Sequence, residues 1–277
     1  MSTSEKVLEE KAEILGPPKS TAREYFESFV ITLVMALFGM TFILQAVTVP
    51  TGSMQNTILV GDYLLVNKVI FNPGGNELPF LPQREIKRGD IIVFKYPGNK
   101  LHPQNDRAHG SSAIPYQVNY VKRVIGLPGE TVEFRNDQVF INGELLPEHR
   151  VVGNFVSNDA PLETREFEER TPDQKWSVYY DERRSLKAAL AGRLEQDPNM
   201  EFGVKGKKMV VPEDNFFVMG DARDNSEDSR FWGFVPRELI VGRAMFVYWS
   251  CDRAASNGSA VGCFTHPRFE RILKFIR

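Results

Sequence analysis

A serine that follows a glycine is the first residue of this chain whose type and setting could do chemistry. Ser53 lies in the sequence Pro-Thr-Gly-Ser-Met, residues 50–54. Gly52 allows a tight turn, which would expose the Ser53 hydroxyl and free backbone N–H groups. Most serines after a glycine are ordinary turn residues, so this short sequence alone indicates little.

A lysine and an arginine are neighbours in a strand-like segment, residues 116–125. Successive side chains of a strand point to opposite faces, so Lys122 and Arg123 cannot both face water from a two-sided strand. We expect one of them to point at the core. A lysine there is costly to keep charged, because desolvation lowers its pKa from about 10.4, and a neutral lysine is a competent general base. The alternative is an edge strand with two solvated cations.

A third cluster, residues 220–230, reads Gly-Asp-Ala-Arg-Asp-Asn-Ser-Glu-Asp-Ser-Arg. Short polar side chains at this density form turns by bonding to the backbone. A calcium loop does not fit, because Arg223 stands where the third ligand would be and Trp232 where the closing glutamate would be. Because apolar strands flank the cluster, it indicates an internal buttress rather than a plain surface turn.

The composition and the histidines argue against other kinds of site. The chain is 42% hydrophobic and 25% charged, which excludes wholesale disorder, and its net charge of -2 gives no indication of nucleic-acid binding. Two cysteines with no Cys/His cluster predict no zinc site. The histidines lie in polar or proline-containing stretches, so we expect no Ser-His-Asp triad. They are His102, His109, His149 and His266.

One segment is long and apolar enough to cross a membrane. Residues 28–61 contain no charged side chain, and a helix over residues 29–49 would span about 32 Å. A buried soluble helix is the alternative, but the stretch is apolar on every face. A cleavable signal peptide would need a basic start and a shorter apolar core. The sequence therefore predicts an uncleaved anchor.

The positive charges on either side of this anchor favour one orientation. The 20 residues before the span carry Lys11, Lys19 and Arg23, whereas the 20 after it carry only Lys68. The positive-inside rule then places the N-terminus in the cytoplasm and the rest of the chain outside. In an oxidising compartment the two cysteines, 251 and 263, could form a disulfide; two unrelated thiols remain the alternative.

In this order, and after a membrane anchor, the three clusters resemble those of bacterial type I signal peptidases, which use a Ser/Lys dyad. Residues 220–230 match the family pattern throughout. The pattern around the nucleophile, Ser-Met-x-Pro-Thr-Leu, is matched less closely, because this chain reads Ser-Met-Gln-Asn-Thr-Ile at residues 53–58. Asn56 replaces the usual proline, which would loosen the turn but removes no reacting atom.

The resemblance assigns a role to each matching residue. Ser53 is expected to be the nucleophile, Lys122 the general base, and Thr51 a contributor of an oxyanion-hole hydroxyl. Ser226 would hydrogen-bond the lysine, Asp228 and Arg230 would hold the shape of the site, and Met54 would pack near the substrate. No metal or cofactor is expected.

The expected fold is mainly β, with one transmembrane helix and an antiparallel β-sheet or barrel. Strand-like runs, Gly/Pro turns and an Asn142-Gly143 turn indicate the β structure, and a short helix is expected at residues 184–194. The expected parts are a cytoplasmic tail (1–27), a transmembrane helix (28–49), a catalytic β core (50–144 and 212–277) and an inserted subdomain (145–211). Aromatic residues such as Phe231, Trp232 and Phe234 are expected either at the membrane interface or in the core.

By this resemblance the protein is a signal-peptide-removing endopeptidase of the inner membrane. Its catalytic domain would lie on the periplasmic face, and it would cut secreted preproteins after small-x-small sites at the bilayer surface. A Ser/Lys protease of narrower specificity, for instance one that matures pilins, is an alternative. A non-catalytic, membrane-anchored scaffold domain is another.

Overall fold

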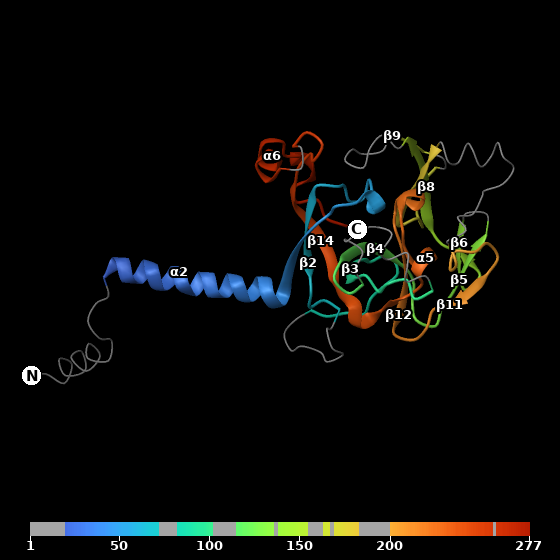
Figure 1. The fold of residues 1–277 in the computed structure, drawn as a ribbon, viewed down its shortest axis with the longest axis horizontal. Helices are drawn as coiled ribbons and strands as arrows, with labels where there is room; N and C mark the ends of the chain where they lie inside the picture. Colours follow the sequence, from blue (N-terminus) through green and yellow to red (C-terminus); the bar gives the residue numbers. More distant parts are fainter. Residues whose placement is uncertain are drawn as a thin grey trace, which may run out of the picture. The chain divides into compact units, whose positions relative to one another are not determined.

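The structure, a computed structural model, describes residues 20–71, 82–101, 115–135, 138–154, 163–166, 169–182, 200–256 and 259–277 (Figure 1). The helix expected at residues 184–194 lies outside them. The chain forms two compact units, Met1–Ile43 and Leu44–Arg277.

The described part of the first unit contains an apolar helix. α2 spans Thr21–Phe38 and continues as a π-helical turn, Gly39–Ile43. Together they form a stretch of 23 residues that contains an 18-residue window with a mean hydropathy of 2.0, none of it buried, so by length and composition this helix could cross a membrane. Inside it, the hydroxyls of Thr32 and Thr41 donate to backbone carbonyls four residues earlier, which satisfies both groups without water.

The bounds of this helix differ from those expected at residues 28–49. The helix begins earlier, at Thr21, and residues Leu44–Thr48 form strand β1 instead of its last turns. An unbroken apolar run does not by itself distinguish a helix from a strand. β1 pairs antiparallel with β2, Asp62–Asn67, and Val47 packs against the core of the second unit. Tertiary pairing therefore decides the end of the helix.

A seven-stranded antiparallel sheet forms the centre of the second unit. Its strand order, β1-β2-β14-β3-β4-β12-β13, places the late strand β14 between the early strands β2 and β3 (Figure 1). The remaining strands of this sheet are β3 Ile91–Lys95, β4 Asn119–Gly126, β12 Asn215–Met219, β13 Val235–Pro236 and β14 Ile240–Ser250.

Two smaller sheets complete the unit. One has the order β11-β5-β6-β7 and the other β10-β8-β9, in which β8 and β10 run parallel. The expected turn is confirmed, because Asn142 and Gly143 join β6 to β7 with φ of 53° and 87°. The strands are β5 Thr131–Arg135, β6 Gln138–Ile141, β7 Glu144–Leu145, β8 Glu148–Asn154, β9 Glu163–Glu166, β10 Trp176–Asp181 and β11 Lys208–Val210.

The described part of the second unit has only short helices besides its strands, so the mainly antiparallel β fold is confirmed. β11, from the expected insertion, pairs with β5, from the expected core. The division of the chain at residues 145 and 211 therefore stays a prediction. The helices are η2 Gly52–Met54, η3 Arg223–Asn225, α5 Ser229–Trp232, η4 Arg237–Leu239, α6 Ala260–Thr265 and η5 Phe269–Arg271.

Trp232 lies in the core and not at a membrane interface. Its side chain is buried, and its ring contacts those of Phe94 and Tyr96 at centroid distances of 5.9 Å each. Phe231 packs partly against the same cluster. Because this cluster fills the space beside β3, β4 and β12, burial of apolar area holds the end of the 220–230 segment against the central sheet.

Cys251 and Cys263 form a disulfide, a pairing that the sequence left open. The bond joins the residue after β14 to α6, and the two cysteines are 12 residues apart in the sequence. A disulfide that closes a loop of this length restricts the unfolded chain and thereby contributes about 3 kcal/mol to the free energy of unfolding.

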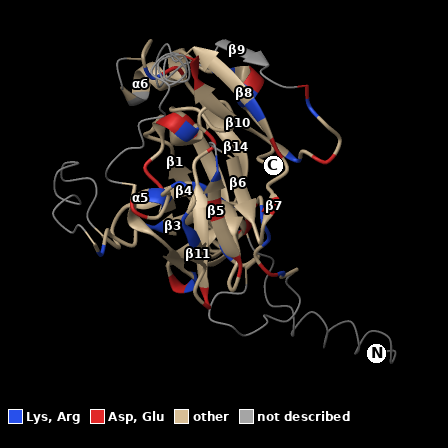
Figure 2. Cartoon of the chain, turned by 90° about the vertical axis from the view of Figure 1, so that its right-hand side faces the viewer, with Lys and Arg blue, Asp and Glu red and all other residues tan. Residues whose placement is uncertain are grey.

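Basic and acidic residues are interspersed along the strands and loops of the second unit (Figure 2). No face in this view carries one sign of charge alone, in keeping with the net charge of -2.

Candidate active site

Ser53 lies in η2, in a short helical turn directly after the extended residue Thr51. Its side chain is 9% exposed. Its backbone carbonyl accepts a hydrogen bond of 3.1 Å from the N–H of Ala222, which belongs to the 220–230 segment. The Thr51 side chain is exposed and makes no capping hydrogen bond. The turn therefore holds Ser53 by its main chain and leaves its hydroxyl for a side-chain partner.

That partner is Lys122, whose Nζ donates to Ser53 Oγ at 2.6 Å. Lys122 lies in the middle of β4, opposite Ile92 of β3, and is 4% exposed. The sequence predicted that one of the two neighbouring cations would face the core, but both are buried, since Arg123 is 2% exposed. The reason is that β4 is an inner strand with protein on both faces. Lys122 points to the serine and Arg123 to Asp221 on the other side.

Burial lowers the pKa of Lys122 from 10.5 to about 8. Loss of hydration is the main cause, because it disfavours the charged ammonium. The carboxylates of Asp228 and Glu227 oppose this shift, and the Arg230 guanidinium adds to it. A lysine with this pKa is neutral in a substantial fraction of molecules at mildly alkaline pH, so it can accept a proton from the hydroxyl that it contacts.

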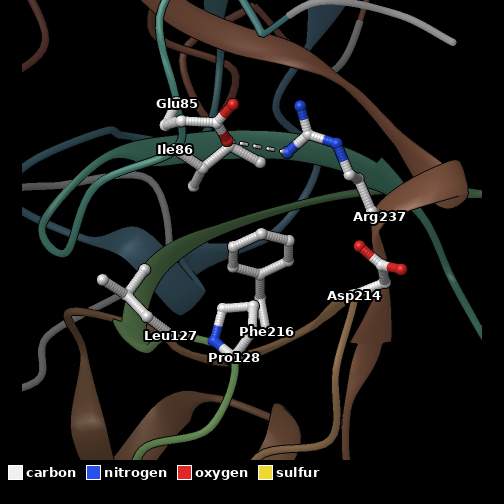
Figure 3. A pocket seen from close by; sticks show the side chains of 7 residues that line it. All are labelled: Glu85, Ile86, Leu127, Pro128, Asp214, Phe216 and Arg237. Carbon is white, nitrogen blue, oxygen red and sulfur yellow. Dashed lines mark ion pairs between the residues drawn. The ribbon is translucent and has the colours of Figure 1, made fainter. Parts of the chain in front are cut away.

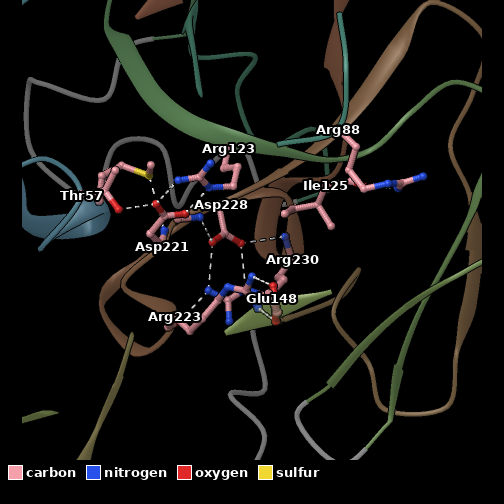
Figure 4. A network of polar contacts seen from close by, with 11 residues as sticks. Thr57, Arg88, Arg123, Ile125, Glu148, Asp221, Arg223, Asp228 and Arg230 are labelled. Carbon is pink, nitrogen blue, oxygen red and sulfur yellow. Dashed lines mark hydrogen bonds and ion pairs between the residues drawn. The ribbon is translucent and has the colours of Figure 1, made fainter. Parts of the chain in front are cut away.

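Asp228 organises the 220–230 segment (Figure 4). It caps α5, and its carboxylate accepts bonds from Ser226 Oγ at 2.8 Å, Gly220 N at 3.0 Å and Arg230 Nε at 2.8 Å. Burial alone would raise the pKa of Asp228, but the charge and hydrogen bonds of Arg230 outweigh it and lower the pKa below its usual value. Asp228 and Arg230 thus hold this turn in shape as a buried charged pair.

Ser226 does not have the partner that the resemblance assigned to it. In the described part of the chain its hydroxyl donates to Asp228 and not to Lys122. Gly220 lies against it: a Cβ on Gly220 would come within 2.2 Å of Ser226 Oγ and 2.5 Å of the Ser53 carbonyl oxygen. Only glycine permits this approach, which brings the segment directly onto the turn of Ser53.

Comparison with known proteins shows the family of this chain. A family described as "Signal peptidase, peptidase S26" matches residues 22–249. The chain belongs to this family. Signal peptidase I of Aquifex aeolicus is 34% identical over 242 residues, which are 82% of this chain and 84% of that protein. Signal peptidase I of Haemophilus influenzae is 31% identical over 97% of this chain and 79% of its own length.

A solved structure of a signal peptidase I from Enterococcus faecalis is 25% identical. It covers 58% of this chain and 97% of its own, with a TM-score of 0.30. Membership in the signal peptidase family makes this chain a peptidase that removes signal peptides, with one apolar N-terminal helix that could anchor it.

Met54, expected near the substrate, is 1% exposed and packs in the core beside Ile58 and Leu64. Its Sδ accepts a hydrogen bond from the N–H of Asp221 at 3.4 Å. In this structure Met54 therefore fixes the turn of Ser53 against the 220–230 segment. Its contact with a substrate stays a prediction.

The sequence reasoning missed a second network beside the dyad. Asp221 accepts two bonds from Arg123, at 2.8 and 2.7 Å, and one from Thr57 Oγ1 at 2.6 Å (Figure 4). Both members of the ion pair are nearly inaccessible, at 2% and 1% exposure. Two adjacent basic residues on an inner strand were the available signal, because each buried cation needs a buried anion.

Asn56, which replaces the proline of the signal peptidase pattern, has a φ of 72°. A proline ring fixes φ near -65°, so this turn does not have the backbone that a proline would impose. The expectation that Asn56 loosens the turn stays a prediction. Asparagine is one of the residues that accept a positive φ most readily.

Replacing Asn56 with proline is expected to lower the free energy of unfolding by about 2–3 kcal/mol, because the ring forbids the observed φ. Asn56→Gly is the matched control, because glycine accepts this φ, and it should change the stability by less than about 1 kcal/mol. Chemical denaturation of the purified variants measures both. A proline variant as stable as the wild type would contradict the left-handed turn.

Among the described residues no group of three or more His, Cys, Asp or Glu side chains is placed to hold a metal. The second unit also contains a cavity of about 290 Å³ (Figure 3). The ion pair of Glu85 and Arg237, 3.7 Å apart, lies across it. Neither Ser53 nor Lys122 lines this cavity, which is bounded by Glu85, Ile86, Leu127, Pro128, Asp214, Phe216 and Arg237.

Proposed function

We propose that this protein is a membrane-anchored serine endopeptidase that uses Ser53 as nucleophile and Lys122 as general base. The observation that carries the proposal is the 2.6 Å hydrogen bond between Ser53 Oγ and the buried Nζ of Lys122. A serine needs an adjacent base to become a nucleophile. The lowered pKa of Lys122 makes this lysine a suitable base. The proposal rests on this contact together with membership in the signal peptidase family.

The reaction proceeds through an acyl-enzyme. Neutral Lys122 accepts the Ser53 proton while Oγ attacks the scissile carbonyl carbon, and the resulting ammonium then protonates the leaving amine as the peptide bond breaks. Lys122, neutral again, takes a proton from a water molecule, which attacks the ester. The proton returns to Ser53 Oγ when the ester bond breaks, and the cleaved signal peptide leaves with a carboxyl group.

The developing oxyanion needs hydrogen-bond donors near Ser53. We assign this role to the Ser53 backbone N–H and the Thr51 hydroxyl. Thr51 is two residues before the nucleophile, its side chain is exposed, and it makes no capping hydrogen bond. A donor of this kind typically contributes about 3 kcal/mol to the lowering of the barrier.

The substrates are secreted preproteins that carry small-x-small cleavage sites, and the enzyme acts at the outer face of the inner membrane. β1 begins at Leu44, directly after the apolar helix, and Ser53 follows nine residues later, so the nucleophile is tied closely to the anchor. The Cys251–Cys263 disulfide supports the external location, since such bonds persist in oxidising compartments. The charges around the helix support a cytoplasmic N-terminus.

The proposal is tested with the full chain purified in detergent and returned to lipid. A preprotein with an Ala-x-Ala site is added, and mass spectrometry locates any cut. We expect a single cut after that site. Cleavage of only a restricted set of exported proteins would favour the narrow-specificity protease. No cleavage of any preprotein by folded enzyme would favour the scaffold domain and overturn the proposal.

A further inference from the structure

The strands of the expected insertion contact the segment that holds the nucleophile. The N–H of Tyr179 in β10 donates to the Asp221 carbonyl at 2.8 Å, and Tyr179 forms a parallel bridge with Ala222. Two residues further along, the N–H of Asp181 donates to the Asp224 carboxylate at 2.9 Å. Residues 221–224 therefore lie along β10 almost as an added strand.

The same residues contact the Ser53 turn on their other side. The Ala222 N–H donates to the Ser53 carbonyl at 3.1 Å, and the Asp221 N–H donates to Met54 Sδ at 3.4 Å. Residues 221–224, called here the bridging segment, are thus held between β10 and the nucleophile.

A buried ion pair fixes the bridging segment to β8, the neighbour of β10. Glu148, the first residue of β8, accepts a bond from Arg223 Nη1 at 2.7 Å and a second from Arg223 Nη2 (Figure 4). The two side chains are 3% and 1% exposed. Such a two-bond pair fixes the direction as well as the distance of the guanidinium. Because Arg223 lies next to Ala222, the pair fixes the residue that holds Ser53.

We propose that Glu148, through Arg223 and the bridging segment, is a positioning residue for Ser53, so that the insertion sets the geometry of the nucleophile. The inference rests on the proposed function of Ser53. Glu148 touches neither Ser53 nor Lys122 in the described contacts. Loss of the pair should therefore displace the serine without changing the base. Misplacement of a reacting group by about 1 Å can lower the rate by about 100-fold.

Two variants test this role in the full-length enzyme. Glu148→Gln removes the charge, and Glu148→Leu/Arg223→Met removes both charges, so that no buried charge is left unpaired. We expect kcat per folded enzyme to fall by about 10–100-fold in both, with KM within about threefold of the wild type. The midpoint of the pH–rate profile should stay at about 8, the pKa of Lys122.

Hydrogen exchange provides a readout that does not depend on activity. The Ala222 amide, bonded to the Ser53 carbonyl, should exchange at least tenfold faster in both variants, while amides of β3 and β4 keep their protection. Glu130→Gln is the matched control. Glu130 pairs with Arg88 at 2.5 Å and accepts the Leu127 N–H, away from the bridging segment, so kcat and Ala222 exchange should not change.

Unchanged kcat and unchanged Ala222 exchange in the folded double variant would overturn the proposal. An equal loss of kcat in Glu130→Gln would also overturn the proposal, because it would show that any destabilisation of the protein lowers the rate. If the wild type cleaves no preprotein, the function proposed for Ser53 fails, and the exchange of the Ala222 amide still decides whether Glu148 positions the turn.

Discussion

Preprotein cleavage by the Ser53→Ala variant is expected to fall by about 10⁵-fold, because no other group replaces the attacking oxygen. The fold should survive, since Ser53 is held by its backbone carbonyl and the lost hydroxyl makes its described bond only to Lys122. Single-turnover assays in lipid, with product detected by mass spectrometry, measure the loss. The substrate should still bind, so KM or the dissociation constant should change by less than about threefold.

Ser250→Ala is the matched control for this experiment. Ser250 is also buried, and its hydroxyl donates to Asp62 at 2.7 Å, away from Lys122. Its loss should lower stability by about 1 kcal/mol and leave cleavage by the folded enzyme unchanged. A Ser53→Ala enzyme that cleaves within tenfold of the wild type would show that another nucleophile acts, and the Ser/Lys mechanism would be abandoned.

Replacing Lys122 with methionine is expected to abolish cleavage and to stabilise the fold at pH 7. Methionine is about as long and apolar but accepts no proton, so the rate should fall by at least about 10⁴-fold. The buried Lys122 pKa lies about 2.5 units below its ordinary value of 10.5, so keeping this lysine protonated costs roughly 3 kcal/mol. The Lys122→Met variant avoids this cost but loses the hydrogen bond to Ser53, so we expect its free energy of unfolding to be higher by about 2 kcal/mol.

The pH dependence of both effects has a definite sign. Between pH 8 and 10.5 the unfolded chain binds a proton on Lys122 that the folded chain has released, so wild-type stability rises with pH across this window. The stability advantage of Lys122→Met should therefore shrink over the same range. Wild-type kcat/KM should rise through pH 8, with about one tenth of the plateau rate at pH 7.

Denaturant unfolding at pH 7 and pH 10, together with a pH–rate profile, measures these changes. Lys95→Met, at an exposed position on β3, is the control and should alter neither. A Lys122→Met protein less stable than the wild type at pH 7, or a wild-type rate that does not depend on pH between 6 and 9, would contradict a desolvated general base. A Lys122→Met protein more stable than the wild type at pH 7, together with a wild-type rate that rises through pH 8, would show a buried lysine maintained at a cost in stability.

The sequence alone predicted the family and the overall fold class of this protein. Ser53 and Lys122 each indicated little alone, but together with the 220–230 segment, and in this order after an apolar segment, they identified the family that the comparisons show. The mainly antiparallel fold also followed from the sequence, because alternating strands and the Asn142-Gly143 turn are local signals. Such signals require no knowledge of which segments meet in space.

Other features depended on contacts between distant residues. Residues 44–48 are apolar enough to continue a helix, and only pairing with β2 makes them a strand. Lys122 and Arg123 are both buried because β4 has neighbours on both sides, which an alternating pattern does not reveal. The left-handed φ of Asn56 likewise departs from the turn that the proline of the family pattern would suggest.

The partners of the charged residues were the least accessible to sequence reasoning. Arg123 and Asp221 are 98 residues apart, and Arg223 and Glu148 are 75 apart. Nothing local selects one carboxylate among the 36 acidic residues of the chain as the partner of a given arginine. The sequence predicted which groups could react. The tertiary structure decided which charges are buried together, because desolvation and pairing act only once the chain has folded.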